Sequence, residues 1–122
     1  MRQLTDHRVN ECNEAIDINV MDEPGAGGAC HEYIVVTNPN DSGTDTMRLT
    51  FQNGPIKEVG TNGLTHEVLL AVVIDRLRSF QAGPYACREN ALALTKIEEA
   101  MHWLHSRTRA RMARGVEGTH EK

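Results

Sequence analysis

The sequence predicts an α+β protein, in which a small N-terminal antiparallel β-sheet is followed by a C-terminal antiparallel helical hairpin. Within residues 1–60, apolar and polar side chains alternate with a period of two between stretches rich in glycine, proline and asparagine. After residue 60 the apolar period lengthens to about 3.6, and one Gly-Pro pair divides the helical pattern into two segments. We therefore expect a β-rich part at 1–60 and a helical hairpin at 61–122, which together form one compact domain.

Three stretches of the N-terminal part carry the strand pattern. They are AIDINVMD at residues 15–22, HEYIVVT at 31–37 and MRLTFQN at 47–53. The segments between them, EPGAGG from Glu23 and NPNDSG from Asn38, consist of residues that accept or preset turn conformations. PIKEV at 55–59 is the candidate for a last strand.

The first helix is expected from about Thr65 to Phe80. Thr65 is a suitable N-cap, and the Glu67 carboxylate in the first turn complements the positive end of the helix dipole. The stretch VLLAVVI at 68–74 is apolar almost all round. A helix of that kind needs covering on more than one side, by the sheet and by another helix, which argues for oligomer contacts.

The second helix is expected from about Ala86 to Arg114, after the breaking sequence QAGPY, with Gly115 at the C′ position. One stripe along this helix follows heptad spacing: Asn90, Leu94, Ile97, Met101, Leu104, Thr108 and Arg111. The stripe is apolar in its middle and polar at both ends. We expect it to form the seam of an αα-hairpin, with candidate binding residues at the polar ends.

Length and charge limit the classes of protein that fit. The chain has 122 residues, a size at which a partner chain often helps to bury the core, and a formal net charge of −4. Residues 1–60 hold four basic against ten acidic residues, and residues 61–122 hold nine against seven. Duplex nucleic acid needs many phosphates neutralised at once, so it does not suit this surface, whereas a small anion suits a local basic pocket.

The cysteines and the apolar runs predict the compartment. Cys12, Cys30 and Cys87 are odd in number and irregular in spacing, which indicates free thiols in a reducing cytosol. No secretory leader pattern opens the chain. No apolar run reaches the roughly 20 residues of a membrane helix, so we expect a soluble protein without membrane contact.

Four arginines stand close together in RTRARMAR at 107–114. At about 100° per residue, three of them continue the buried stripe and one points to the opposite side: Arg107, Arg111 and Arg114 against Arg109. Two interpretations are open. The arginines stabilise the end of the helix and pair with Glu98 or Glu117, or they bind phosphate or carboxylate oxygens of a ligand.

Two further residues flank the corner between the predicted helices. Phe80 offers an aromatic face on which a base stacks, and Asn90 offers an amide to a nucleobase edge or a ribose. The structural alternatives are a core plug for Phe80 and a helix cap or a satisfied buried amide for Asn90.

Other chemical signals are weak. His66, His102 and His105 lack the carboxylate and the HExxH spacing of a metal site. GAGG at 25–28 lacks the Lys-Ser/Thr of a phosphate-binding loop, and no nucleophile with a base is recognisable. We therefore predict no metal, no cofactor and no catalytic residue.

The C-terminal half resembles a known family. The pieces that carry the resemblance are NGLT leading into LLAVVIDRLRSFQ, then ENALALTKIEEA, WLHSRTRAR and RGVEGT, which together cover about half of the chain. They are similar to the helical hairpin of the Thoeris anti-defence 1 family of phage cyclic-nucleotide sponges, a hairpin shared with anti-CBASS sponge proteins. The N-terminal half matches only in its β-rich character.

The resemblance implies a function and its partners. It implies a non-enzymatic phage or prophage protein that binds and sequesters cyclic ADP-ribose isomers in the host bacterial cytoplasm. Some members of the family bind cyclic oligonucleotides, di- or trinucleotides, at a separate site. Members assemble as homo-oligomers, either dimers or trimers of dimers.

The resemblance also assigns residues. Phe80 and Asn90 match an aromatic residue and an asparagine of the cyclic ADP-ribose pocket. Arg107 and Arg111 match two arginines of the cyclic oligonucleotide site. Lys57 is the candidate for a basic residue that the β-rich part contributes.

Two other classes of protein compete with a sponge. One is a nucleic-acid-binding or scaffold protein that uses the basic end of the second helix. The other is a hydrolase that degrades the signal.

Overall fold

The computed structural model describes residues 1–41 and 45–122 and confirms the α+β class. The chain forms two compact units. The sheet unit consists of Met1–Gly54 and Thr61–Leu64, and the hairpin unit consists of Pro55–Gly60 and Thr65–Lys122. The grouping of both parts into one compact domain stays a prediction.

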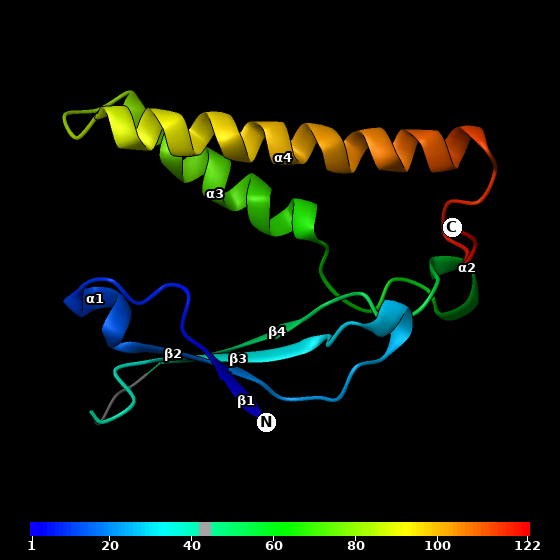
Figure 1. Ribbon diagram of the computed structural model, residues 1–122, viewed down its shortest axis with the longest axis horizontal. Coiled ribbons are helices and arrows are strands. Elements are labelled where there is room, and N and C mark those ends of the chain that lie inside the picture. Colours follow the sequence, from blue (N-terminus) through cyan, green and yellow to red (C-terminus); the bar gives the residue numbers. More distant parts are fainter. Residues whose placement is uncertain (42–44) are drawn as a thin grey trace. The chain divides into compact units, whose positions relative to one another are not determined.

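The sheet unit contains an antiparallel four-stranded sheet in the order β1-β2-β3-β4 (Figure 1). The strands are β1 (Arg2–Leu4), β2 (Ile16–Val20), β3 (Glu32–Thr37) and β4 (Thr46–Thr50). The three strands that alternation predicts are confirmed. β1 was not predicted, because three residues are too few to show a period of two. The short helix α1 (Glu11–Glu14), with Asn10 as its N-cap, was not predicted either.

Register explains why one face of the sheet is apolar. Val20 lies opposite Tyr33, and Tyr33 lies opposite Leu49, so the three side chains project from the same face. Val20 is only 1% exposed. The Tyr33 ring meets the Phe51 ring edge to face, with 5.6 Å between centroids. These contacts form the small core of the sheet unit.

Both predicted turns can be compared with the structure. In EPGAGG, a short 3₁₀ turn at Ala26–Gly28 places Gly27 and Gly28 at φ of 74° and 81°, where glycine has no steric penalty. In NPNDSG, residues 42 and 43 lie outside the described residues. Within the described part, Asn38 has φ of 49°, and the Asp41 N–H donates to the Asn38 carbonyl at 3.0 Å.

The expectation of a last strand at 55–59 is wrong, because this segment forms the short helix α2 (Ile56–Val59) in the hairpin unit. Pro55 is its N-cap, and the Pro55 carbonyl accepts hydrogen bonds from the N–H groups of Glu58 and Val59. The Lys57 N–H donates to the Gly118 carbonyl at 2.9 Å. The Lys57 N–H, which a neighbouring strand would bind if this segment were a strand, is therefore bound by Gly118 near the C-terminus.

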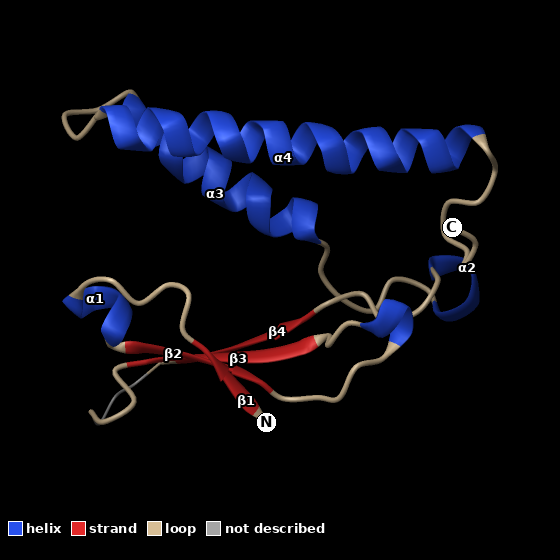
Figure 2. Cartoon of the chain, viewed as in Figure 1, coloured by secondary structure: helices blue, strands red, loops and turns tan. Residues whose placement is uncertain are grey.

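The hairpin consists of α3 (His66–Gln81) and α4 (Arg88–Ala113) (Figure 2). The Thr65 hydroxyl accepts the Val68 N–H at 3.3 Å, so the predicted N-cap is confirmed. α4 begins two residues later than predicted, after Cys87 as its N-cap. Gly115, with φ of 74°, follows the end of α4 as predicted.

The heptad stripe forms the buried side of α4, which packs on α3 along part of its length and binds the C-terminal tail at Arg111. All seven of its residues are partly or fully buried, whereas most other residues of α4 are exposed. From α3, Ile74 is buried, with 6% of the residue exposed. The covering that we expected around VLLAVVI is incomplete in the single chain, because Val72 remains 62% exposed and Val68 46% exposed.

Gly63 packs closely against the backbone of Thr50 and Phe51 in the sheet unit. A Cβ at Gly63 would lie 2.4 Å from the Phe51 carbonyl carbon and 2.6 Å from the Thr50 carbonyl oxygen, both backbone atoms that cannot move aside cheaply. We expect Gly63→Ala to lower the free energy of unfolding by about 1–3 kcal/mol, as overpacking does. Thermal denaturation followed by circular dichroism measures this loss.

The control for this prediction is Gly83→Ala, because a Cβ at Gly83 would make only an ordinary contact of 3.5 Å with the Ser79 carbonyl. Gly83→Ala should leave the melting temperature almost unchanged. Equal melting temperatures for the two variants would show that the close approach at Gly63 is not a constraint.

Candidate functional site

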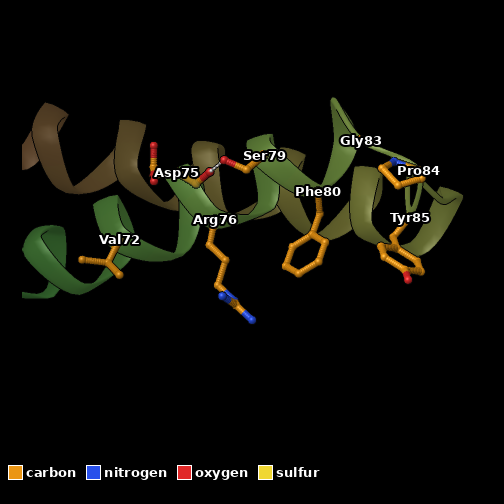
Figure 3. Close-up of a pocket in the computed structure, with 8 residues that line it drawn as sticks. All are labelled: Val72, Asp75, Arg76, Ser79, Phe80, Gly83, Pro84 and Tyr85. Atoms are coloured by element: carbon orange, nitrogen blue, oxygen red, sulfur yellow. Dashed lines mark hydrogen bonds between the residues drawn. The ribbon is translucent and has the colours of Figure 1, made fainter.

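A cavity of about 540 Å³ lies along α3 and the turn that leads into α4. Figure 3 shows the residues that line it. They are Val72, Asp75, Arg76, Ser79, Phe80, Gly83, Pro84 and Tyr85. The wall therefore combines aromatic rings, one guanidinium group and one carboxylate.

Phe80 lies in the last turn of α3 and contributes its ring to the cavity. The Arg76 Cζ atom lies 5.0 Å from the centroid of the Phe80 ring, in a cation–π contact. The two residues are four positions apart in α3, so they share one face of the helix. This arrangement offers an apolar ring face beside a positive charge, which suits a planar base linked to phosphates.

The turn between the helices is held by the side-chain amide of Gln81. Gln81 Nε2 donates to the Cys87 carbonyl, and the Cys87 N–H donates to Gln81 Oε1, both at 3.1 Å. Ala86 N–H also donates to the Gly83 carbonyl at 3.3 Å. These bonds fix the short loop that carries Tyr85 on the edge of the cavity.

Asn90 lies near the same turn but not in the cavity wall. It is half-buried in the first turn of α4, where it begins the heptad stripe. Its backbone N–H donates to the Cys87 sulfur at 3.4 Å. Of the predicted pair, the structure therefore places only Phe80 against the cavity, with Asn90 on the second helix flanking the same turn.

Arg111 is buried, with 7% of the residue exposed, and binds the C-terminal tail at residues 116–122. Its Nε donates to the Glu117 carboxylate at 3.2 Å. Its terminal nitrogens donate to three tail carbonyls: Val116 at 2.9 Å, Thr119 at 3.1 Å and Glu121. For Arg111, the predicted pair with Glu117 is confirmed. Glu98, the other predicted partner of the arginines, instead pairs with Arg78 of α3 at 2.7 Å.

The other three arginines of this cluster, Arg107, Arg109 and Arg114, are exposed. The exposure of Arg109 agrees with its predicted orientation. Arg107 and Arg114 were expected to continue the buried stripe together with Arg111, but only Arg111 is buried. The physical reason is length, since α4 has 26 residues and α3 has 16. With a rise of about 1.5 Å per residue, α4 is about 15 Å longer than α3. Figure 1 shows the last turns of α4 continuing past the start of α3.

The family comparison covers the larger part of these elements. The model of the Acb2/Tad1 hairpin domain matches residues 45–109, which is more than half of the chain. The chain belongs to the Acb2/Tad1 hairpin-domain family. This match includes all of α3, the turn with its cavity, and α4 as far as Arg109.

One curated relative supports this membership. The protein named Thoeris anti-defense 1, from Bacillus phage SBSphiJ7, is 57% identical to this chain over 74 residues. The aligned part covers 61% of this chain and 52% of the relative. The match therefore spans about half the length of the relative.

Within this member of the Acb2/Tad1 hairpin family, Lys57 lies apart from the cavity wall. It is an exposed residue of α2, and the neighbouring Glu58 carboxylate lies 3.2 Å from His120 Nδ1 of the tail. Lys57 thus belongs to the hairpin unit beside the tail that Arg111 holds, and it does not come from a strand.

The sequence patterns did not indicate that Arg76, Tyr85 and Gln81 lie at the cavity and its turn. The signal for Arg76 was its position one turn before Phe80, which places both on the same helical face. The signal for Tyr85 was its position directly after the Gly-Pro pair, because an aromatic residue in such a turn is not expected to be buried in a core. The role of Gln81 depends on the closure of the turn and had no sequence signal.

Three further expectations concern other residues. In the described ranges, no group of three or more His, Cys, Asp and Glu side chains is placed to hold a metal ion. Cys12, Cys30 and Cys87 are all free thiols in the structure. In the same described ranges, no helix has the length and apolar character that crossing a bilayer requires.

Proposed function

We propose that this chain is a phage anti-defence protein, which binds and sequesters cyclic ADP-ribose-type signals of Thoeris immunity without degrading them. The observation that carries this proposal is membership of the Acb2/Tad1 hairpin-domain family, with 57% identity over 74 residues to a Thoeris anti-defense 1 protein. Because that relative comes from a Bacillus phage, we propose the cytoplasm of an infected bacterium as its place of action.

The cavity at Phe80 supports this proposal on physical grounds. Its volume of about 540 Å³ lies within the range of about 300–1,000 Å³ that small-molecule sites occupy. The Phe80 ring provides a stacking surface, and Arg76 provides a positive charge for phosphate oxygens. A sponge needs only affinity, and roughly −12 kcal/mol corresponds to a nanomolar Kd.

We also propose that the chain acts as a homo-oligomer, a dimer or a trimer of dimers. Among the large apolar residues of the hairpin unit, Val72, Trp103 and Met112 are 62%, 64% and 62% exposed. These side chains are apolar surface that a second chain could cover, and a chain of this size gains from burying more apolar area against a partner. Light scattering on the unaltered protein measures the assembly directly, and a monomer would contradict the proposal.

A second site for cyclic di- or trinucleotides is proposed at the C-terminal end of α4. Arg107 is exposed there, and no ion pair described for residues 1–41 and 45–122 involves it. The Arg111 guanidinium is already bound to the tail. We therefore assign direct phosphate binding to Arg107 and indirect support, through the tail, to Arg111.

Isothermal titration calorimetry against a panel of cyclic ADP-ribose isomers and cyclic di- and trinucleotides tests the proposed function. We expect saturable, stoichiometric binding of at least one cyclic ADP-ribose isomer. Denaturing the complex and separating the released ligand by chromatography should recover that isomer intact. A degraded ligand would indicate the hydrolase, and no binding of any isomer would overturn the proposed function.

The nucleic-acid-binding alternative has its own measurement. Mobility shift with duplex and single-stranded DNA at about 0.15 M salt should show no complex, because the first sixty residues hold ten acidic against four basic residues. DNA binding that falls steeply as salt rises would favour that alternative over a sponge.

A further inference from the structure

Three side chains of the cavity project to one side of the hairpin. Figure 3 shows Arg76, Phe80 and Tyr85 pointing in the same direction, with Phe80 between the other two. Arg76 and Phe80 come from successive turns of α3, whereas Tyr85 comes from the loop after it. This side therefore has a cation at one end and two aromatic rings at the other.

Arg76 differs from Arg78, although only two residues separate them in α3. Arg78 pairs with Glu98 across the hairpin at 2.7 Å. No ion pair described for residues 1–41 and 45–122 involves Arg76, whose guanidinium instead lies 5.0 Å from the Phe80 ring centroid. A guanidinium without a carboxylate partner at the edge of a cavity is available to phosphate oxygens, which it binds in a bidentate manner.

Asp75 also lines the cavity and carries the opposite charge. In Figure 3, its side chain points away from the Arg76 guanidinium and the two rings. The charge that faces the space beside Phe80 is therefore the positive charge of Arg76.

Tyr85 is an aromatic residue whose side chain is exposed to solvent. It is 74% exposed, so burial in a core does not explain its position. The loop that carries it is closed by the two hydrogen bonds between Gln81 and Cys87. Two aromatic rings that project side by side at the same turn offer stacking surfaces for a planar base.

We propose that Arg76 and Tyr85 complete the ligand site, with the base of a cyclic ADP-ribose isomer stacked on the rings of Phe80 and Tyr85 and its phosphate groups bound by Arg76. Gln81 is then a positioning residue that orients Tyr85 through the turn. This assignment rests on the proposed function, because it specifies the recognition groups of the same cavity. It selects ligands that carry both a planar base and an anion close to it.

The test compares matched variants by calorimetry, with the cyclic ADP-ribose isomer that binds the unaltered protein most tightly. We expect Arg76→Gln to weaken binding about tenfold to a hundredfold, since it removes charge-assisted hydrogen bonds. Arg78→Gln, which removes the same charge from the same helix, should change Kd less than about threefold. The Kd of Arg76→Gln should also depend less on salt than that of the unaltered protein.

Tyr85 is tested by two substitutions on the same exposed position. Tyr85→Ala should weaken binding about tenfold, the scale of one base stack, whereas Tyr85→Phe keeps the ring and should bind within about threefold of the unaltered protein. Because Tyr85 is exposed, both variants should keep the melting temperature of the unaltered protein.

The outcomes separate this proposal from the proposed function. If the unaltered protein binds and Arg76→Gln binds equally well, or no more weakly than Arg78→Gln, the role of Arg76 is overturned while the sponge remains. Normal binding by Tyr85→Ala overturns the role of Tyr85 in the same way. If the unaltered protein binds no isomer, the proposed function fails and this assignment fails with it.

Discussion

Replacing Phe80 and Asn90 together with alanine is expected to abolish measurable binding of cyclic ADP-ribose isomers while the chain stays folded. Loss of the Phe80 ring removes the stacking surface of the cavity, which is worth about 1–3 kcal/mol per base. Loss of the Asn90 amide removes a donor and an acceptor from the helix that flanks the turn. Calorimetry with the same isomer panel measures the result.

The single variants Phe80→Ala and Asn90→Ala measure how much of the lost affinity comes from α3 and how much from α4. Phe80→Ala should account for most of the loss, because only Phe80 lies in the cavity wall of the single chain. Phe80→Tyr serves as the control, since it keeps an aromatic ring and should retain binding. Circular dichroism and light scattering must show an unchanged fold and assembly. Normal affinity in the double variant would show that the ligand binds elsewhere.

Replacing Arg111 with alanine is expected to lower the free energy of unfolding by about 2–4 kcal/mol. The Arg111 guanidinium supplies the donors for the Glu117 carboxylate and for the Val116 and Thr119 carbonyls. Most of the loss should come from the carbonyls. The Glu117 side chain is 37% exposed, so water screens that ion pair. Urea denaturation measures the change, and limited proteolysis shows whether residues 116–122 become detached.

Arg109→Ala is the matched control for Arg111→Ala, because it removes an exposed arginine from the same end of α4. Its effect on stability should not exceed a few tenths of a kcal/mol. Glu117→Ala should fall between the two, since it removes one of the acceptors and leaves the carbonyls bound. If Arg109→Ala destabilised the chain as much as Arg111→Ala, the tail would not depend on Arg111.

The same variants separate direct from indirect roles at the proposed second site. Arg107→Ala should weaken cyclic trinucleotide binding without lowering stability, because Arg107 is exposed. Arg111→Ala should lower both the affinity for the cyclic trinucleotide and the stability, since Arg111 acts through the tail. Neither variant should change the affinity of the Phe80 cavity for cyclic ADP-ribose isomers much, because sites that share no residues behave additively.

Local patterns in the sequence determined three strands of the sheet and both helices of the hairpin. Alternation determined β2, β3 and β4, because one face of each strand must be apolar in an antiparallel sheet. The heptad stripe of α4 identified seven positions that are all partly or fully buried in the structure. The Thr65 cap and Gly115 marked helix ends through hydrogen bonds and backbone angles within a few residues. These features depend on neighbours in sequence, so a sequence pattern can specify them.

Tertiary structure alone decided the features that join distant residues. Residues 55–59 form α2 beside the tail, where the Lys57 N–H donates to the Gly118 carbonyl. Arg111 is buried by residues that follow α4, and not by α3, because α3 is too short to reach it. The position of Tyr85 likewise depends on how the turn closes. The sequence specified which side chains were available, but the partner of each polar group was set by packing between segments that no local period links.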